Sequence, residues 1–419
     1  MLEIHKNKKT KVAVVCPCLK NHLEALFVSD VKAREAEAEG LVLAMGQDVV
    51  LLKTVKLSQF VSKSFFGKGT LEQLKEECQQ VNAELLVVDM PISAVQQRNL
   101  EKILNLKVID RTAVILEIFG QRAHTNEGKL QVELAHLTYQ RSRLVRSWTH
   151  LERQRGGGGF LGGPGETQIE LDRRHLDDRI VKIKKELEKV RKTRAIQRGA
   201  RVKVPFPVAA LVGYTNAGKS SLFNLITHAD VFAQDMLFAT LDPTMRKIAL
   251  DKNCDIILSD TVGFISNLPH ELVMAFRATL EEVLEADVIV HVIDVANPNY
   301  KEQRLDVLNV LHELGLSKIE FENRYIEVFN KIDLLDTSEK KNLIDRIGHR
   351  TVALSALSGE GVDNFIRLLK AKFYKNTEIK TLCVPIDDGK KLAEIYRTAQ
   401  VLDRRDDGER IFLRIRCSS

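Results

Sequence analysis

Eight residues, Gly213-Tyr-Thr-Asn-Ala-Gly218-Lys219-Ser220, have the residue types and spacing of a phosphate-binding loop. An apolar run over residues 207–212 precedes them, and a helical pattern begins at Ser221. A strand would bring the chain into the turn, and a helix would point its positive N-terminal end at a polyphosphate. We expect Lys219 to contact the β- and γ-phosphates and the Ser220 hydroxyl to bind Mg²⁺. The loop alone predicts a nucleotide without saying which one.

A second motif, Asp260-Thr-Val-Gly263, ends the apolar run at residues 255–259. Its aspartate can hold Mg²⁺ through water, and the N–H of its glycine can meet a γ-phosphate. The segment between the two motifs should supply a threonine that closes on Mg²⁺ when a γ-phosphate is present. Thr240 and Thr244 are both candidates, and we favour Thr240.

Two further motifs predict that the base is guanine. Asn330-Lys-Ile-Asp333 follows the apolar run at residues 325–329, and its Asp333 can accept hydrogen bonds from both N1–H and the N2 amine of guanine. Adenine offers an acceptor where Asp333 needs a donor, and a polar site rejects a base that leaves its groups unpaired. Ser355-Ala-Leu357 would present backbone N–H groups to the guanine O6. The four motifs in series predict a GTPase.

The predicted site therefore consists of five short runs. Catalytic roles are predicted for Lys219, Thr240, Gly263 and Asn216, and metal ligation for Ser220 and Thr240. The residues predicted to contact the nucleotide are Gly213, Tyr214, Thr215, Asn216, Ala217, Gly218, Lys219, Ser220, Phe238, Ala239, Thr240, Leu241, Asp242, Asp260, Thr261, Val262, Gly263, Asn330, Lys331, Ile332, Asp333, Ser355, Ala356 and Leu357.

Several longer stretches together resemble the HflX family of GTPases. They are GYTNAGKSSLFN, FATLDPT, DTVGFI, LPHELVMAFRATLEEVLEAD, NKID and the glycine-rich RSWTHLERQRGGGGFLGGPGETQIELDRR. The resemblance runs from about Gly67 to the end of the GTPase domain. It implies GTP hydrolysis with Mg²⁺, binding to the large ribosomal subunit and its RNA, and dissociation of stalled or idle ribosomes under stress.

Other roles are also compatible with these residues. The protein could mature a subunit without splitting ribosomes, or dock a protein partner rather than RNA. The N-terminal sheet could instead bind ATP and drive RNA remodelling, since Gly67-Lys68-Gly69 precedes a predicted helix and could bind an anion.

Position 264 is a phenylalanine where many small GTPases place the glutamine that orients the attacking water. A phenyl ring cannot make that hydrogen bond, so we expect slow intrinsic hydrolysis. Potassium-activated GTPases carry asparagine at the position of Asn216, and this resemblance implies that Asn216 helps to hold K⁺ between the phosphates. The alternative is that Asn216 bonds to its own loop backbone.

A basic helical arm is predicted before the GTPase motifs. Residues that are apolar except for Arg141 repeat at alternating spacings of four and three over residues 130–151. Apolar residues repeat in the same way over 176–190, which predicts an antiparallel coiled-coil hairpin. Residues 141–201 contain 17 Lys and Arg against 8 Asp and Glu, whereas the whole chain is only +6. A basic arm on a mildly acidic body favours a nucleic-acid partner over a merely solvated helix face.

The tip of the arm, residues 153–166, is rich in glycine, which allows close approach of the backbone to a partner. Two apolar residues within it could stack on or wedge into RNA. The predicted RNA contacts are Gly156, Phe160, Leu161, Gly163, Arg173 and Arg174.

The fold class predicted for the whole chain is α/β, because short apolar runs alternate with helical patterns through residues 11–125. We predict an N-terminal parallel α/β subdomain (1–128), the helical hairpin (129–199), a P-loop GTPase domain (204–375) and a small α+β C-terminal subdomain (376–419). In the last of these we predict a strand at 378–386, a helix at 390–402, a turn at 403–410 and a strand at 410–417.

The composition predicts the cellular compartment of the protein. The six cysteines form no CxxC pair or metal-ligand cluster, which is typical of a reducing compartment. No apolar run is long enough to span a bilayer. We expect a monomeric protein in the cytoplasm, with peripheral membrane association as an open alternative.

Overall fold

The computed structural model describes residues 9–20, 28–154, 164–201, 206–228, 237–238, 244–251, 254–266, 282–316, 318–374 and 377–418. The chain forms two compact units. The first comprises Met1–Leu187, Gln234–Asp242 and Ile265–Arg277, and the second comprises Glu188–Ala233, Pro243–Phe264 and Ala278–Ser419. No helix among the described residues is both long and apolar enough to cross a membrane.

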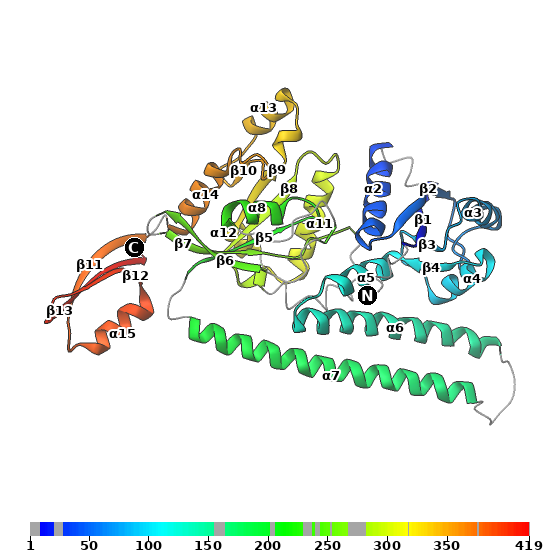
Figure 1. Ribbon diagram of the computed structural model, residues 1–419, viewed down its shortest axis with the longest axis horizontal. Helices are drawn as coiled ribbons and strands as arrows, with labels where there is room; N and C mark the ends of the chain where they lie inside the picture. The colour runs from blue at the N-terminus through cyan, green and yellow to red at the C-terminus, as the bar shows by residue number, and fades with distance from the viewer. Residues whose placement is uncertain are drawn as a thin grey trace, which may run out of the picture. The chain divides into compact units, whose positions relative to one another are not determined.

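A four-stranded parallel sheet with strand order β2-β1-β3-β4 forms the centre of the first unit (Figure 1). Its strands are β1 (Lys11–Leu19), β2 (Asp48–Leu57), β3 (Leu85–Val88) and β4 (Lys107–Asp110). The helices that alternate with them are α2 (Val28–Ala44), α3 (Lys68–Gln80), α4 (Ala94–Leu104) and α5 (Arg111–Arg122). This confirms the predicted α/β alternation.

The helix α5 was not predicted, because no turn residue separates it from the strand before it. Asp110 ends β4 and is at the same time the N-cap of α5, where its side chain accepts a hydrogen bond from the backbone N–H of Ala113. Such a cap starts a helix without any glycine or proline in the sequence.

The predicted hairpin is present as two antiparallel helices, α6 (Asn126–Gln154) and α7 (Pro164–Arg201) (Figure 1). Ile180 and Ile183 are buried, as expected for seam residues of α7. Two ion pairs also join the helices, Arg141 to Asp177 at 3.0 Å and Arg179 to Glu133 at 2.7 Å. The helix α7 begins earlier than predicted, at a proline, because proline is tolerated in the first turn of a helix. Residues 155–163, which include the predicted contacts Gly156, Phe160, Leu161 and Gly163, lie outside the described residues.

The second unit contains a six-stranded sheet with order β10-β9-β8-β5-β7-β6, in which only β6 runs antiparallel to its neighbour. Its strands are β5 (Val208–Gly213), β6 (Thr244–Asp251), β7 (Cys254–Asp260), β8 (Val288–Asp294), β9 (Tyr325–Asn330) and β10 (Thr351–Ala353). Its helices are α8 (Lys219–Thr227), α11 (Tyr300–Glu313), α12 (Lys318–Arg324), α13 (Thr337–Asp345) and α14 (Val362–Tyr374), with a 3₁₀ turn η1 (Ile332–Leu334).

The sheet is held by a core in which α8 and α14 pack on the same side chains. Phe223 of α8 and Phe365 of α14 join strand residues such as Leu211 and Val290 in one buried cluster. Because β5, β7, β9 and β10 are parallel, their carboxyl ends meet at one edge of the sheet. All four predicted nucleotide motifs follow these ends, so the sheet brings them together.

A three-stranded antiparallel sheet, β11-β13-β12, closes the second unit with one helix on its inner face. Its elements are β11 (Thr377–Pro385), α15 (Gly389–Thr398), β12 (Gln400–Asp406) and β13 (Arg410–Ser418). The prediction of a helix to residue 402 and a turn over 403–410 was wrong. Residues 400–406 form a strand because they pair with β13, and their charged side chains concealed the strand pattern in the sequence.

Candidate functional site

The loop between β5 and α8 has the shape of a phosphate cradle. Asn216 and Gly218 both have positive φ, 60° and 90°, which turns successive backbone groups toward one side. Lys219 is the first residue of α8 and is buried, and its Nζ donates to the carbonyl oxygens of Gly213 at 3.1 Å and Tyr214 at 2.7 Å. The lysine is therefore held inside the loop, and its contact with the β- and γ-phosphates stays a prediction.

Burial lowers the pKa of Lys219 to about 8, while the charge of Asp260 acts in the opposite direction. A buried ammonium group whose pKa falls in this way gains strongly from an added negative charge. The loop is thus electrostatically suited to a phosphate, which would restore the ordinary pKa of the lysine.

Ser220 and Asp260 place two hard oxygen ligands side by side. The Ser220 hydroxyl donates to Asp260 Oδ2 at 2.7 Å, and the aspartate is fully buried at the end of β7. Hydroxyl and carboxylate oxygens are the ligands that Mg²⁺ prefers. The pair fits that ion by its donor chemistry. Thr240, the other predicted ligand, lies outside the described residues, as do Ala239, Leu241 and Asp242.

Gly263 is pressed against the phosphate loop. A Cβ at this position would lie 2.9 Å from Thr215 Cα and 3.0 Å from Lys219 Nζ, so only glycine fits. The next residue, Phe264, donates its N–H to the Gly213 carbonyl at 3.0 Å and accepts from the Thr215 N–H at 2.6 Å. Its ring is buried, which shows that position 264 serves packing. The backbone of the second motif is thereby fixed to the first.

Asn330 connects three of the motifs. Its Nδ2 donates to the carbonyl of Ala217 in the phosphate loop at 2.8 Å, and its Oδ1 accepts from the N–H of Ala356 at 2.9 Å. A Cβ on Gly218 would collide with Nδ2 of this asparagine. The Asn330 side chain therefore braces the loops around the predicted base position, and its contact with the nucleotide stays a prediction.

The residues on either side of the predicted base position divide into exposed and buried groups. Asp333 is exposed, so its carboxylate is accessible to a ligand. Ile332 is buried in a cluster with Ile293 and Val295, so its side chain fixes the turn to the core of the unit. Lys331, with φ of 65°, forms an ion pair of 2.8 Å with Asp294. Asp294 was not predicted, and its signal in the sequence was its place at the end of the apolar run that forms β8.

Two other predicted residues donate hydrogen bonds inside the protein. The Ser355 N–H donates to the Glu360 carbonyl at 2.9 Å, and the Thr261 hydroxyl donates to the Leu211 carbonyl at 2.6 Å. Val262 is buried, whereas Leu357 is 86% exposed.

The first unit holds two more residues that bear on the predictions. Phe238, predicted to contact the nucleotide, is buried with its ring 4.7 Å from that of Phe119, centroid to centroid. Ser266, three residues after Gly263, has its backbone carbonyl 3.1 Å from the guanidinium of Arg111. Arg111 is itself buried between Asp89 and Glu37, and these contacts raise its pKa above the ordinary value.

The sequence did not indicate this buried ion cluster, because no neighbouring residue distinguishes Arg111 from a solvent-exposed helix residue. Its carboxylate partners lie on other elements of the unit, at the end of β3 and in α2.

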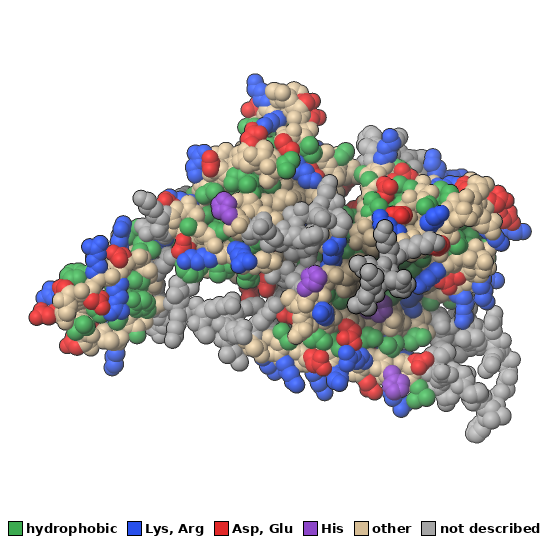
Figure 2. Space-filling view, viewed as in Figure 1, with side chains coloured by type: hydrophobic (Ala, Val, Ile, Leu, Met, Phe, Trp, Pro, Cys, Tyr) green, Lys and Arg blue, Asp and Glu red, His purple; other side chains and the backbone are tan. Residues whose placement is uncertain are grey.

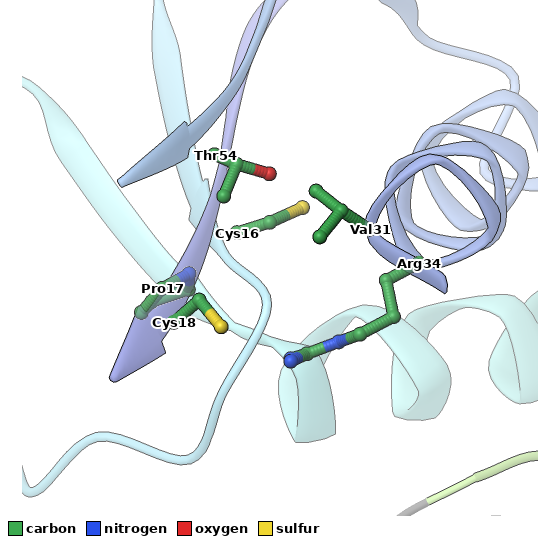
Figure 3. A pocket seen from close by; sticks show the side chains of 6 residues that line it. All are labelled: Cys16, Pro17, Cys18, Val31, Arg34 and Thr54. Carbon is green, nitrogen blue, oxygen red and sulfur yellow. The ribbon is translucent and has the colours of Figure 1, made fainter. Parts of the chain in front are cut away.

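A small pocket also lies in the first unit. Its lining, shown in Figure 3, consists of Cys16, Pro17, Cys18, Val31, Arg34 and Thr54. Burial raises the pKa of the Cys16 thiol to about 12, so this thiol stays protonated and is a poor nucleophile. Nothing in the lining resembles a phosphate loop.

The arm presents its charge to solvent. Figure 2 shows Lys and Arg side chains, with some Asp and Glu among them, along the lower edge of the view, where α7 runs. The predicted contacts Arg173 and Arg174 are both exposed there, as are Lys182, Lys184 and Lys185.

The chain is similar to known proteins along most of its length. Residues 32–120 match a family model described as GTP-binding GTPase N-terminal, residues 122–201 one described as GTP-binding GTPase Middle Region, and residues 208–331 one described as 50S ribosome-binding GTPase. A solved GTP-binding protein from Sulfolobus solfataricus in complex with GDP is 24% identical with a TM-score of 0.45, covering 87% of this chain and 98% of that one.

Two curated relatives are similar enough to this chain to show its family. GTPase HflX of Magnetococcus marinus is 48% identical over 363 residues, which cover 86% of this chain and 82% of that protein. GTPase HflX of Escherichia coli is 44% identical over 364 residues, covering 86% and 84%. Since the phosphate loop, the Ser220–Asp260 pair and the Asn330 brace all lie within the region these relatives share, the chain belongs to the HflX family of GTPases and hydrolyses GTP.

Proposed function

We propose that this protein binds the large ribosomal subunit through its basic arm and uses GTP to separate the subunits of stalled or idle ribosomes in the cytoplasm. The observation that carries the proposal is the exposed basic side of α7, on a chain whose GTPase domain matches a model described as 50S ribosome-binding GTPase. Ribosomal RNA is a polyanion, and exposed Lys and Arg provide affinity for phosphates without reading sequence.

Within the nucleotide site we assign each residue a role. Lys219 neutralises the β- and γ-phosphates, and the N–H of Gly263 contacts the γ-phosphate at the position where its backbone meets the loop. Asp333 accepts from the guanine, while Asn330 holds the loops that surround the base. Water attacks the γ-phosphorus, and the bond to the bridging oxygen breaks to give GDP and phosphate.

Mg²⁺ would be held by Ser220, directly, and by Asp260, through water, with Thr240 joining when GTP is present. When bound, the ion neutralises charge on the transferring phosphoryl group. Asn216 is exposed, and among the described residues its side chain forms no hydrogen bond, so its carbonyl oxygen is available for a K⁺ ion. These features support the cation role over the alternative of a bond to its own loop.

A test of the proposal separates the arm from its tip. Replacing residues 156–165 with a short neutral linker should leave GTP hydrolysis and salt-sensitive ribosome binding largely intact but impair subunit separation. Reversing Arg173, Arg174, Lys184 and Lys185 to glutamate should weaken binding itself, most strongly at low salt.

Two results would contradict the proposal. If the tip variant separated subunits at the wild-type rate, the glycine-rich stretch would be only a hinge. If the charge-reversed variant bound ribosomes as the wild type does, the arm would contact a protein. Subunit binding without any splitting by the wild-type protein would favour a role in subunit assembly.

A further inference from the structure

The C-terminal sheet presents one face that is exposed at residues 410, 412 and 414 of β13, whereas Arg416, further along the same row, is buried against Tyr374 and Cys254. Residues 411, 413 and 415 of β13 point toward α15, together with Leu382 and Val384 of β11, and form a small buried core. The alternate residues of all three strands therefore point the other way. In an antiparallel sheet with one covered face, the other face is expected to be polar.

This open face departs from that expectation at its centre. Phe412, on the central strand β13, is 39% exposed although it is a large aromatic residue. Its direct partners across the sheet are Arg405 on β12 and Cys383 on β11. Arg410 and Arg414 flank it along its own strand and are also exposed. The exposed ring thus has one arginine opposite it on β12 and one arginine on each side of it along β13.

The charge of this face is unbalanced. Among the described residues that register places on it, the exposed charged side chains are those of Arg405, Arg410, Arg414 and Asp403. Asp403 lies 3.4 Å from Arg405, which remains 82% exposed despite this contact. Directly opposed strand residues are about 5 Å apart and same-face neighbours along a strand about 7 Å, so all three arginines reach the space around the ring.

We propose that this face, formed by Arg405, Arg410, Phe412 and Arg414, is a binding surface for single-stranded RNA. An unpaired base stacks on the Phe412 ring, and the neighbouring phosphates contact the three arginines. Aromatic rings on a sheet flanked by basic residues bind single strands with little sequence preference, because every base offers a π-face. An acidic protein would need only the arginines. The exposed ring therefore favours RNA as the partner. The surface is separate from the arm, and the inference does not depend on the proposed ribosomal function.

The test uses the full-length protein with GDP and a fluorescent single-stranded oligouridine of about 12 nucleotides, followed by anisotropy. Phe412→Leu keeps an apolar side chain without the ring and should weaken binding about fivefold or more, whereas Phe412→Tyr keeps the ring and should bind as the wild type does. Both changes lie on an exposed face, and thermal unfolding of each variant verifies the fold.

The arginines are tested against a matched pair of lysines. Arg410→Gln with Arg414→Gln should reduce the slope of log affinity against log salt by about 1.4, as for two lost phosphate contacts on a single strand. Lys390→Gln with Lys391→Gln removes the same charge from exposed positions on α15 and should leave the slope unchanged. In addition, a photoreactive uridine in the oligonucleotide should crosslink to the β13 peptide.

Unchanged RNA affinity in the Phe412→Leu variant, equal effects of the two double variants, or crosslinks confined to other peptides would overturn the inference. If the arginine variant lost ribosome binding while oligouridine binding stayed intact, the face would bind an acidic protein instead, and the RNA inference would again be wrong. Sedimentation of the wild-type protein with large subunits distinguishes the two proposals. If the wild-type protein did not sediment with large subunits, the ribosomal function would be refuted. The dependence of oligouridine binding on Phe412 would still stand.

Discussion

The side-chain amide of Asn330 lies 2.8 Å from the carbonyl of Ala217, although the two residues are 113 positions apart in the sequence. The same amide group accepts from Ala356. One buried side chain therefore ties the phosphate loop to both segments that are predicted to surround the base. The phosphate and base ends of the site cannot shift independently while this bridge is intact.

We predict that Asn330→Ala destabilises the protein even without nucleotide. The change leaves a buried carbonyl and a buried N–H unpaired, and each costs about 1–3 kcal/mol. Chemical denaturation should thus show a loss of about 2–6 kcal/mol in the free energy of unfolding of the second unit. Asp333→Asn, at an exposed position in the same motif, is the control and should alter stability by no more than about 0.5 kcal/mol. Equal stabilities of the two variants would show that the bridge is not structural.

The same Asp333→Asn variant should change the base that the protein prefers. Asparagine can donate to the 2-oxo group of xanthine where aspartate accepts from the guanine amine. We expect weaker GTP binding and a gain in affinity for xanthosine triphosphate, measured by competition between the two nucleotides. An unchanged preference for GTP would remove Asp333 from the base site.

Nucleotide affinity should depend on pH through Lys219, whose pKa burial lowers to about 8. Bound phosphate raises this pKa, so the complex takes up a proton wherever the free protein has lost one. GTP affinity should therefore be insensitive to Lys219 below pH about 7 and should fall above pH about 8, approaching tenfold per pH unit. Lys219→Arg stays charged and should lack this decline. A parallel decline in both proteins between pH 7 and 9 would assign it to another group.

Hydrolysis should respond to K⁺ through Asn216. Because Phe264 is buried and cannot orient water, we expect a slow intrinsic rate that rises in potassium relative to sodium salts and rises further with large subunits. Charge supplied to a GTPase in trans is worth about 10³–10⁵ in rate. Asn216→Ala should abolish the potassium effect, as measured by phosphate release in matched salts. Equal rates of the wild-type protein in the two salts would leave Asn216 with a role in the loop alone.

Most of the fold and the order of the motifs could be predicted from the sequence, because each motif is short and follows its own strand. The phosphate loop needs only Gly213 to Ser220 and the strand before it, all of which are contiguous. What Asn330 does could not be read in this way, since its partners Ala217 and Ala356 come together only when β5, β9 and β10 align in one sheet.

Two other features depended on tertiary contacts. Arg111 is paired with two carboxylates, one directly after β3 and one in α2, and nothing adjacent in the sequence indicates this. The strand β12 was missed because its Asp403 and Arg405 lie on the open face of a sheet whose register is set by β13. A charged run of this kind is interpreted as a turn when its partner strand is not known.

The proposed function requires that GTP direct the protein to the large subunit. The direct measurement is density-gradient sedimentation of ribosomes with the protein and either a non-hydrolysable GTP analogue or GDP. We predict that with the analogue the protein migrates with large subunits and the peak of intact ribosomes declines, and that with GDP both effects are much weaker. Absence of the protein from the ribosomal fractions in either state, or identical profiles with the analogue and with GDP, would contradict the account.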